Sequence, residues 1–321
     1  MTNPDSSRVR IGISSCLLGE NVRFDGGHKK DDFLTNHFGS FVEWVQVCPE
    51  VEIGLGIPRE SLRLVADGGN IRLAAPRSGL DHTERMTQWT KEKTSQLVDQ
   101  NLCGYVLKRS SPSCGLERVK VYDRSGMPNR QGRGLFAAGM VERFPNLPME
   151  EEGRLNDSRL RENFVSQVFC YKRWMDLLRD GLTRARIVQF HARHKYLLMA
   201  HHQAGVRRLG NLIGAAKRTT SVRSLGEEYF NAFCELMRRT PTRRNHANVL
   251  QHLAGYFSTK LDAADRTELA TVIDRYRLEY LPLIVPITLI RHYVRKFDVQ
   301  YLKDQVYLNP GTDELHLLNQ L

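Results

Sequence analysis

The chain has 321 residues, 41% of them hydrophobic and 26% charged, which is typical of a soluble protein with room for two domains. Its longest apolar run, residues 281–290, contains two prolines and is too short to span a membrane, so we expect no membrane partner. The polar first ten residues do not resemble a signal peptide, which predicts a cytoplasmic location. In that reducing compartment the six cysteines are expected to form no disulfides.

Positive charge is concentrated in the second half of the chain. Residues 1–150 contain 20 Lys and Arg against 18 Asp and Glu, whereas residues 151–321 contain 27 against 18, within a formal net charge of +11. Between Arg184 and Arg244 there are 13 basic and 3 acidic residues. A dense positive field attracts phosphate backbones, which favours a nucleic acid partner over the alternative of a solvated helical surface.

Strands are predicted to alternate with helices in the first half. Short apolar runs predict buried strands at residues 9–15, 41–47, 103–108 and 119–122. Helical spacing of apolar residues predicts helices at 83–101 and 134–144. This order indicates an α/β domain with a mostly parallel sheet and flanking helices, whose site lies at the carboxyl ends of the strands.

A segment rich in proline and acidic residues, 144–153, predicts a domain boundary, and we place the domains at 1–148 and 149–321. Beyond it, helical spacing predicts six helices and no strands. The predicted helices are residues 157–179, 183–203, 225–239, 242–258, 263–280 and 285–297. The second domain is therefore predicted to be all-helical.

Three cysteines follow predicted strands, in loops that contain Gly or Pro: Cys16, Cys48 and Cys114. Since carboxyl ends of parallel strands meet at one edge of a sheet, the three thiols are expected to converge. A structural zinc usually takes four ligands from paired motifs, which this sequence lacks, whereas an iron–sulfur cubane is bound by cysteine thiolates. Three protein ligands leave one iron open as a Lewis acid. Three free cysteines that pack as small hydrophobic residues are an equal alternative from spacing alone.

The motifs around these cysteines closely resemble those of the 2-thiouracil desulfidase family. They are Ser14-Ser-Cys-Leu-Leu-Gly19 with Val22-Arg-Phe-Asp-Gly-Gly27, then Cys48-Pro-Glu50, then Lys108-Arg-Ser-Ser-Pro-Ser-Cys-Gly115. This resemblance covers roughly the first 145 residues. Residues from about 155 onward, including 190–201, 245–252 and 282–293, resemble the helical domain often fused to such enzymes. The two-domain arrangement resembles bacterial desulfidases that convert 4-thiouridine in transfer RNA to uridine.

The resemblance implies a [4Fe-4S] cluster on Cys16, Cys48 and Cys114, with one open iron that takes a thiocarbonyl sulfur. It implies non-redox hydrolysis of a C–S bond with the cluster as Lewis acid. The remaining cysteines are interpreted as packing residues: Cys103, Cys170 and Cys234.

Glu50 is the candidate general base because it lies two residues from Cys48, and the family pattern supports that role. The alternative is a carboxylate that caps a helix start or pairs with an arginine. Ser111 is predicted to orient the substrate base or relay a proton, and a turn-stabilising hydroxyl beside Pro112 is an equal alternative.

Three further polar residues of the matching motifs are candidate substrate contacts: Arg23, Asp25 and Lys108. A structural salt bridge between Arg23 and Asp25 explains those two residues equally well.

The helical half is predicted to bind RNA through a track of basic and histidine side chains. Helix packing is the close alternative for some of the histidines, and a metal site is disfavoured because no H-E-x-x-H carboxylate accompanies them. A wide grip on the RNA backbone would offset the few kcal/mol that flipping a base out of its stack costs. The predicted contacts are Arg184, Arg186, His191, Arg193, His194, Lys195, Arg207, Arg208, Lys217, Arg218, Arg243 and Arg244.

These features together predict a desulfidase of 4-thiouridine in transfer RNA, with that RNA as partner and no obligatory protein partner. One alternative is a desulfidase of free thiouracil or thionucleosides, with a merely structural helical half. The others are a non-catalytic RNA-binding protein with an iron–sulfur cluster or zinc, and a DNA repair protein.

Overall fold

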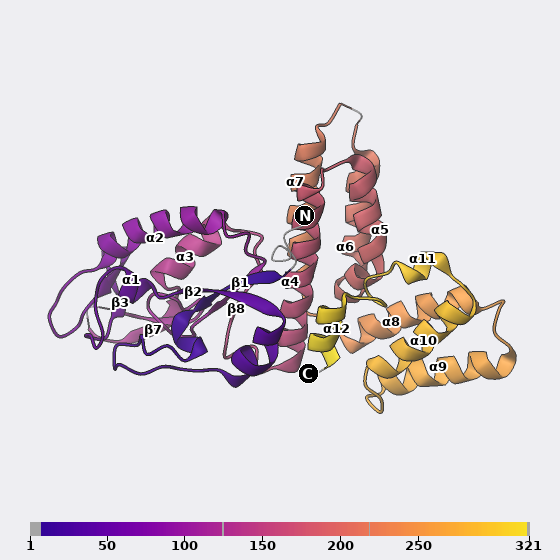
Figure 1. Ribbon diagram of the computed structural model, residues 1–321, viewed down its shortest axis with the longest axis horizontal. Helices are drawn as coiled ribbons and strands as arrows, with labels where there is room; N and C mark the ends of the chain where they lie inside the picture. The colour runs from indigo at the N-terminus through magenta and orange to yellow at the C-terminus, as the bar shows by residue number, and fades with distance from the viewer. Residues whose placement is uncertain (1–7, 124, 218, 320–321) are drawn as a thin grey trace, which may run out of the picture. The chain divides into compact units, whose positions relative to one another are not determined.

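The computed structural model describes residues 8–123, 125–217 and 219–319, which divide into two compact units (Figure 1). The first unit falls within Met1–Phe164 and Val168–Lys172, and the second within Val165–Gln167 and Arg173–Leu321. Arg218 of the predicted RNA contacts lies outside the described residues. In the described part of the chain, no helix has the length and apolar character needed to cross a membrane.

A parallel four-stranded sheet forms the centre of the first unit. Its order is β2 (Val42–Val47), β1 (Val9–Ser14), β5 (Gly104–Leu107) and β8 (Met149–Glu151), and all three pairings are parallel. Gly12 of β1 pairs with Tyr105 of β5, and a Cβ at Gly12 would lie 2.2 Å from the tyrosine ring. The close packing of these two strands therefore requires glycine at this position.

Two predicted helices, α2 (Thr83–Val98) and α3 (Leu135–Arg143), pack together over this sheet (Figure 1). Their apolar sides share a buried cluster with β5, in which Leu97, Phe136 and Met140 accompany Tyr105 and Leu107. The hydrophobic effect therefore holds the sheet and the two helices as layers around one core. The predicted α/β class, with a parallel sheet and flanking helices, is confirmed.

A second, mixed sheet was not predicted. Its order is β4 (Asn70–Ala74), β3 (Arg63–Asp67), β6 (Val119–Tyr122) and β7 (Pro128–Gly132), with antiparallel outer pairs and a parallel central pair. The prediction that residues 119–122 join the other strands in one sheet is wrong. The signal was weak because these strands bury few side chains, such as Leu64, Leu73 and Val119, among charged and small residues.

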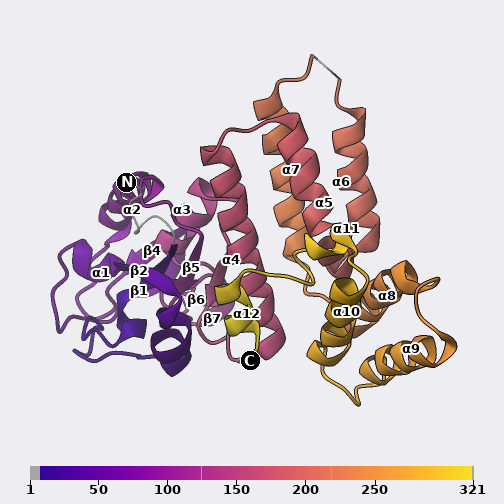
Figure 2. The ribbon, with the colours of Figure 1, turned by 45° about the vertical axis from the view of Figure 1, so that its right-hand side comes forward.

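The second unit is helical, as predicted. α4 (Ser158–Arg179) contributes residues to both units, and the helices that follow belong to the second. These are α5 (Arg184–His201), α6 (Gln203–Ala215), α7 (Val222–Met237), α8 (Arg243–Ala254), α9 (Ala263–Arg277), α10 (Ile284–Lys296), α11 (Gln300–Lys303) and α12 (Thr312–Asn319). Helices α5, α6 and α7 pack side by side (Figure 2).

The sequence predicts one helix over residues 183–203, and the C-terminal end of this prediction is wrong. Helix α5 stops at His201, and His202 adopts an extended conformation and caps α6, because its Nδ1 accepts a hydrogen bond of 3.1 Å from the backbone N–H of Gly205. Histidine is not a usual capping residue, so the sequence carried no clear signal for this break.

An aromatic core fills the space between α4, α5 and α7. The Trp174 ring stacks on Phe230 with centroids 4.7 Å apart, and Phe190 meets Trp174 at 5.1 Å. His194 stacks on Phe190 and His201 is also buried. Burial lowers the pKa of His194 to about 3 and that of His201 to about 4, so both rings are neutral near pH 7.

Acidification from pH 7 to pH 5 is expected to destabilise the helical unit. An unfolded histidine has a pKa of about 6.5. Between that value and the lower folded pKa values, the unfolded state binds more protons, so the free energy of unfolding decreases as pH falls. Each histidine contributes up to about 1.4 kcal/mol per pH unit. Urea unfolding followed by Trp174 fluorescence in a Trp44→Phe/Trp89→Phe background measures the effect, since Trp174 is the only tryptophan of this unit.

The matched control for this pH dependence compares a buried histidine with an exposed one. His201→Gln is expected to reduce the slope of unfolding free energy against pH, whereas replacing the exposed His252 with Gln leaves it unchanged. Equal slopes in the parent and both variants would contradict the assignment to buried histidines.

Candidate active site

The three singled-out cysteines follow three neighbouring parallel strands. Cys16 lies in the short helix Ser15–Leu18 directly after β1. Cys48 directly follows β2 and precedes α1 (Pro49–Glu52), and Cys114 lies in the loop after β5. Because β2, β1 and β5 are adjacent and parallel, their carboxyl ends bring the three cysteines to one edge of the sheet.

The thiols of these cysteines affect one another electrostatically. Burial raises the pKa of Cys16 to about 11, and a smaller contribution comes from Cys48. Burial likewise raises the pKa values of Cys48 and Cys114, and in Cys114 both other thiols add to the effect. The effects of Cys16 and Cys48 on the pKa of Cys114 accord with the placement of all three at one edge of the sheet.

Cysteine thiolates are the ligands of an iron–sulfur cubane, so the chemistry of this donor set fits such a cluster. Within the described ranges, no group of three or more His, Cys, Asp or Glu side chains is placed to hold one metal ion. In a cubane each thiolate binds a different iron. Bound metal also favours the thiolate, which suits thiols whose charged form burial disfavours. The other cysteines lie elsewhere in the sequence, and Cys103 and Cys170 are buried in the core.

The loop of Cys114 is attached to the first turn of α3. The backbone N–H groups of Gly134, Leu135 and Ala137 donate to carbonyls of the loop at 2.8, 3.1 and 3.2 Å. A Cβ at Gly134 would lie 2.4 Å from the Ser113 carbonyl oxygen, so only glycine permits this approach. These hydrogen bonds satisfy N–H groups at the start of α3 that have no acceptor within the helix. They also hold the loop against the helix and so fix the position of Cys114.

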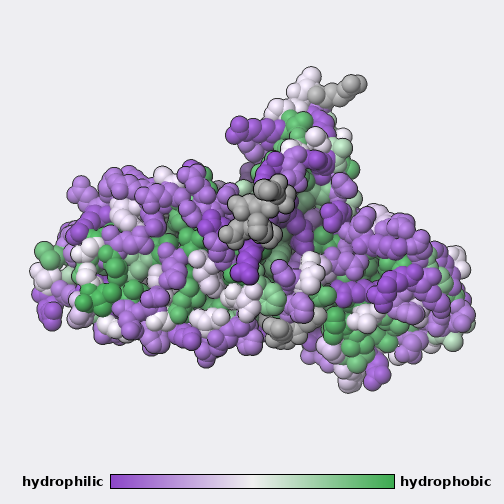
Figure 3. Space-filling view, viewed as in Figure 1, coloured by the Kyte–Doolittle hydropathy of each residue, from purple (hydrophilic) through white to green (hydrophobic). Residues whose placement is uncertain are grey.

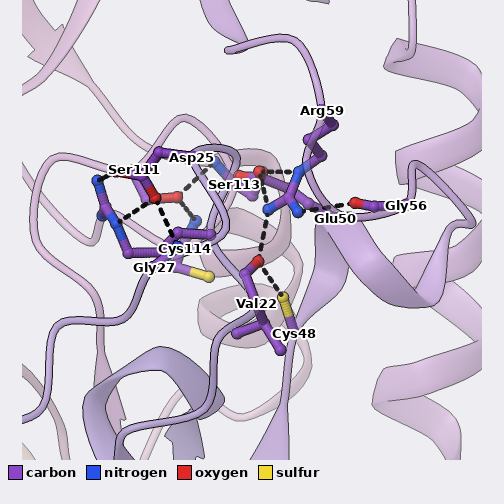
Figure 4. A network of polar contacts seen from close by, with 11 residues as sticks. Val22, Asp25, Gly27, Cys48, Glu50, Gly56, Arg59, Ser111, Ser113 and Cys114 are labelled. Atoms are coloured by element: carbon purple, nitrogen blue, oxygen red, sulfur yellow. Dashed lines mark hydrogen bonds and ion pairs between the residues drawn. The ribbon is translucent and has the colours of Figure 1, made fainter.

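Glu50 connects the second and third cysteine motifs (Figure 4). Its Oε1 accepts a hydrogen bond of 2.9 Å from the hydroxyl of Ser113, the residue before Cys114. Its Oε2 accepts from Nε and Nη2 of Arg59 at 3.0 and 2.7 Å. The predicted general base is thus an ion-paired carboxylate, as the arginine alternative proposed, and its catalytic role stays a prediction.

Ser113 and Arg59 are site residues that the sequence reasoning missed. Ser113 is fully buried and faces Glu50, whereas the hydroxyl of Ser111 accepts from the backbone N–H groups of Ser113 and Cys114 at 3.2 and 3.1 Å. Ser111 therefore makes the turn-stabilising contacts that were its alternative. Arg59 follows Glu50 by nine residues, and nothing in that spacing predicted the pair.

The candidate substrate contacts are engaged in local interactions. Arg23 and Asp25 form an ion pair of 3.4 Å, and a hydrogen bond from the backbone of Gly27 lowers the pKa of Asp25. Lys108 pairs with Glu152, and its charge is near enough to Cys16 to oppose the rise in that thiol's pKa. The structural alternative thus describes the observed contacts of Arg23 and Asp25.

Some predicted RNA contacts have structural partners instead. Arg184 donates to the carbonyls of Lys217 and Thr220 at 2.8 and 2.6 Å, and Arg186 donates to the carbonyls of Asp180 and Gly181. These guanidinium groups therefore join helix ends within the unit.

The predicted histidines also pack inside the helical unit. His194 is 1% exposed and His191 contacts the Tyr229 hydroxyl at 3.3 Å, so helix packing describes both better than an RNA surface. Lys195 is half-buried beside the Tyr196 ring. The other described members have exposed side chains: Arg193, Arg207, Arg208, Lys217, Arg243 and Arg244. Hydrophilic residues also cover most of the face shown in Figure 3.

Replacing Arg59 is expected to destabilise the first unit. Its side chain is 6% exposed and that of Glu50 15%, so Arg59→Met leaves a mostly buried carboxylate without its partner. One-sided loss of a buried pair costs about 3 kcal/mol or more. Urea unfolding of the Trp174→Phe variant, followed by the fluorescence of Trp44 and Trp89, measures the change.

The matched control is Arg72→Met in the same unit, whose ion pairs with Asp67 and Asp81 are exposed. We expect its unfolding midpoint to stay close to that of the parent, because exposed pairs contribute little. The double variant Arg59→Met/Glu50→Gln should recover part of the lost stability. A midpoint for Arg59→Met equal to that of the control would contradict this account.

Comparisons with known proteins match two separate parts of the chain. Residues 11–152 match the model of the 2-thiouracil desulfurase family, and residues 195–311 match DUF1722, a family of unknown function. The uncharacterized protein YbgA of Escherichia coli (strain K12) is 29% identical over 153 residues, which are 48% of this chain and 90% of YbgA. The uncharacterized protein YbbK of Bacillus subtilis (strain 168) is 29% identical over 110 residues, which are 33% of this chain and 72% of YbbK.

A solved structure also matches. It is the [4Fe-4S]-dependent thiouracil desulfidase TudS, which is 28% identical and covers 47% of this chain and 95% of its own, with a TM-score of 0.38. The family predicted from the cysteine motifs is confirmed by the family match. Residues 11–152 thus match the 2-thiouracil desulfurase family, and residues 195–311 match DUF1722.

Proposed function

We propose that this protein is a [4Fe-4S]-dependent desulfidase that converts 4-thiouridine in transfer RNA to uridine. The observation that carries the proposal is the hydrogen bond between Ser113 and Glu50. It joins the motif of Cys48 to the motif of Cys114, so a carboxylate lies beside two of the three converging thiols. A candidate base and a soft metal-binding set are the two components that hydrolysis of a thiocarbonyl needs.

Cys16, Cys48 and Cys114 would hold the cluster. When bound, it supplies an open iron that acts as a Lewis acid toward the soft thiocarbonyl sulfur. The matching motifs contain three cysteines and no fourth, which accords with an open coordination position.

Glu50 is the group that would take the proton from the attacking water. Arg59 holds Oε2 and the Ser113 hydroxyl holds Oε1, so the carboxylate is oriented before the substrate arrives. The C–S bond breaks as a C–O bond forms, and the overall change is thiocarbonyl plus water to carbonyl plus hydrogen sulfide. Because no electrons are transferred, the reaction requires no electron carrier.

The charge of the helical unit supports RNA as the substrate. Exposed cations such as Arg207, Lys217 and Arg244 offer contacts to phosphates, which position an RNA without reading its sequence. A thiolated base must leave its stack to reach buried thiols, and contacts to the backbone offset that cost. The cytoplasmic location and the lack of an obligatory protein partner stay predictions.

Free thiouracil is a second candidate substrate. The family that matches residues 11–152 takes its name from 2-thiouracil, which is a free base. A neutral free base would not need a basic protein surface in order to bind. Comparison of turnover with thiolated transfer RNA and with free thiouracil, on one enzyme preparation, separates the two candidates.

Alanine at each of the three site cysteines is expected to reduce bound iron. Protein purified and reconstituted without oxygen should contain about four irons and four sulfides per chain if a cubane forms. Cys16→Ala, Cys48→Ala and Cys114→Ala remove one ligand each and should lower both contents severely. Iron and sulfide analysis with the visible absorption spectrum measures the effect. Cys234→Ala, in the helical unit, is the control and should retain the parent content.

Glu50→Gln is expected to abolish desulfuration while the cluster is retained. Glutamine keeps the size of the side chain but is a much weaker base, so loss of a general base should slow turnover by about 10²–10⁴-fold. The assay follows 4-thiouridine in bulk bacterial transfer RNA by near-ultraviolet absorbance, with uridine measured by nucleoside analysis.

Undiminished turnover in Glu50→Gln would rule out this residue as the base. Ser111→Ala, which removes only the hydroxyl that caps its loop, tests whether disturbing the loop alone lowers the rate. A third outcome is that unsubstituted protein with a full cluster leaves thiolated RNA unchanged and still desulfurates free thiouracil. That result would identify free thiouracil, the second candidate, as the substrate.

A further inference from the structure

A basic cavity of about 570 Å³ is lined by residues of the first unit. This volume is within the range of ligand pockets, about 300–1,000 Å³. Two carboxylates, Glu117 and Glu151, also line it. Six basic residues line the cavity: Arg63, Arg109, Arg118, Lys120, Arg130 and Arg154.

Most of these cations are not neutralised by an ion pair. Arg154 pairs with Glu150 at 2.8 Å, but the side chains of the other five form no ion pair with any residue that the structure describes. The Glu151 carboxylate accepts hydrogen bonds from the backbone N–H groups of Leu116 and Glu117 at 2.8 and 3.3 Å. Net positive charge therefore remains in the cavity, and like charges gathered in this way are costly unless an anion joins them.

Arg63 is one of the cations that line the cavity. Its guanidinium lies over the Tyr122 ring, 5.2 Å from the centroid, and its Nε is buried with no hydrogen-bond partner. A planar guanidinium of this kind matches the oxygens of a phosphate group.

The cavity adjoins the loop of the third cysteine. Arg109, Ser110 and Pro112 line it and belong to the segment that continues through Ser113 to Cys114. A ligand held in the cavity would therefore contact the loop that carries Cys114 and Ser113, and Ser113 is the hydrogen-bond partner of Glu50. A neutral free base has no group that needs such a cavity, whereas the phosphates of a nucleic acid strand do.

We propose that this cavity binds the phosphodiester backbone of the RNA next to the thiolated nucleotide. The inference rests on the proposed function and extends it, because it assigns an RNA contact to the α/β unit itself. The helical unit and the cavity then hold different stretches of one backbone, and the cavity holds the stretch beside the cysteine loop. A free mononucleotide also carries a phosphate ester and could occupy the same cavity. The experiment must therefore distinguish a mononucleotide from the RNA backbone as the ligand.

The experiment measures binding of unthiolated transfer RNA by fluorescence anisotropy over a range of salt concentrations. Arg118→Ala/Arg130→Ala removes two exposed cations of the cavity. We expect affinity about tenfold weaker and a slope of log affinity against log salt smaller by about 1.5, as for the loss of two phosphate contacts. The control Arg77→Ala/Arg143→Ala removes the same charge from exposed positions of the first unit outside the cavity.

Equal binding and equal salt slopes in parent and cavity variant would overturn the proposal, as would an equal loss in the control pair. Lys120→Glu, an exposed substitution on β6, gives a second test in case the double variant has a lower unfolding midpoint. Binding of uridine 5′-monophosphate to both proteins distinguishes the sources. Mononucleotide binding that is lost in the cavity variant, together with RNA binding and a salt slope equal to those of the parent, would assign the cavity to a mononucleotide and reject the RNA backbone.

These binding measurements use unthiolated RNA and no turnover, so they are independent of the proposed reaction. Parent protein that binds RNA through the cavity but never releases sulfur would refute the desulfidase and keep the cavity. Sulfur release from RNA with cavity variants that bind as the parent does would keep the desulfidase and refute the cavity.

Discussion

The site depends on the contact between the loop of Cys114 and the first turn of α3. Three backbone N–H groups of that turn, which have no partners within the helix, donate to loop carbonyls. Gly134 permits the contact because any side chain there would meet the loop backbone. The same loop carries Ser113, so the contact fixes the partner of Glu50 as well as the thiol. A helix terminus thus positions the third cysteine relative to two others that strand ends position.

The site combines two electrostatic regions of opposite character. Around the cysteines, burial disfavours charge on the thiols, and the nearby carboxylate is paired with Arg59. The cavity lined by Arg109, Ser110 and Pro112 of the same loop has six cations, of which only Arg154 forms an ion pair among the described residues. A neutral base and a charged backbone are the two parts of a nucleotide in RNA, and each region suits one of them. Selectivity for a polymer over a free base would then come mainly from contacts to the backbone.

The sequence predicted the parallel sheet, two flanking helices and the helical second half because buried strands and amphipathic helices leave strong periodic patterns. It did not predict the second sheet, in which strands such as β4 and β7 are mostly exposed and follow no clear alternation. It also missed Arg59, whose pairing with Glu50 depends on how the loop after α1 returns to the sheet. Motifs located Cys16, Cys48 and Cys114, but tertiary contacts decided that Ser113 rather than Ser111 faces the carboxylate.

Surface residues were the hardest to assign from sequence. Arg184 and Arg186 lie in a basic stretch of the sequence that predicts an RNA-binding surface. In the structure they donate hydrogen bonds to backbone carbonyls within the unit. A charged side chain on a helix gives no local sign of whether it faces solvent or a neighbouring turn, so charge density identified the region and not the individual contacts.

Helix α4 has a consequence for dissecting the protein into modules. Phe164 packs edge-on against Phe38 with centroids 6.2 Å apart, and a methyl group of Val168 lies against Gly104, so this helix completes the first unit. Trp174, two turns further on, is in the aromatic core of the second. A first unit that ended at the Pro-rich segment before α4 would lack the apolar side chains with which α4 covers the sheet. A second unit that began after α4 would lack Trp174 in its core. The two units share one helix, so each can be expressed intact only in a form that duplicates it.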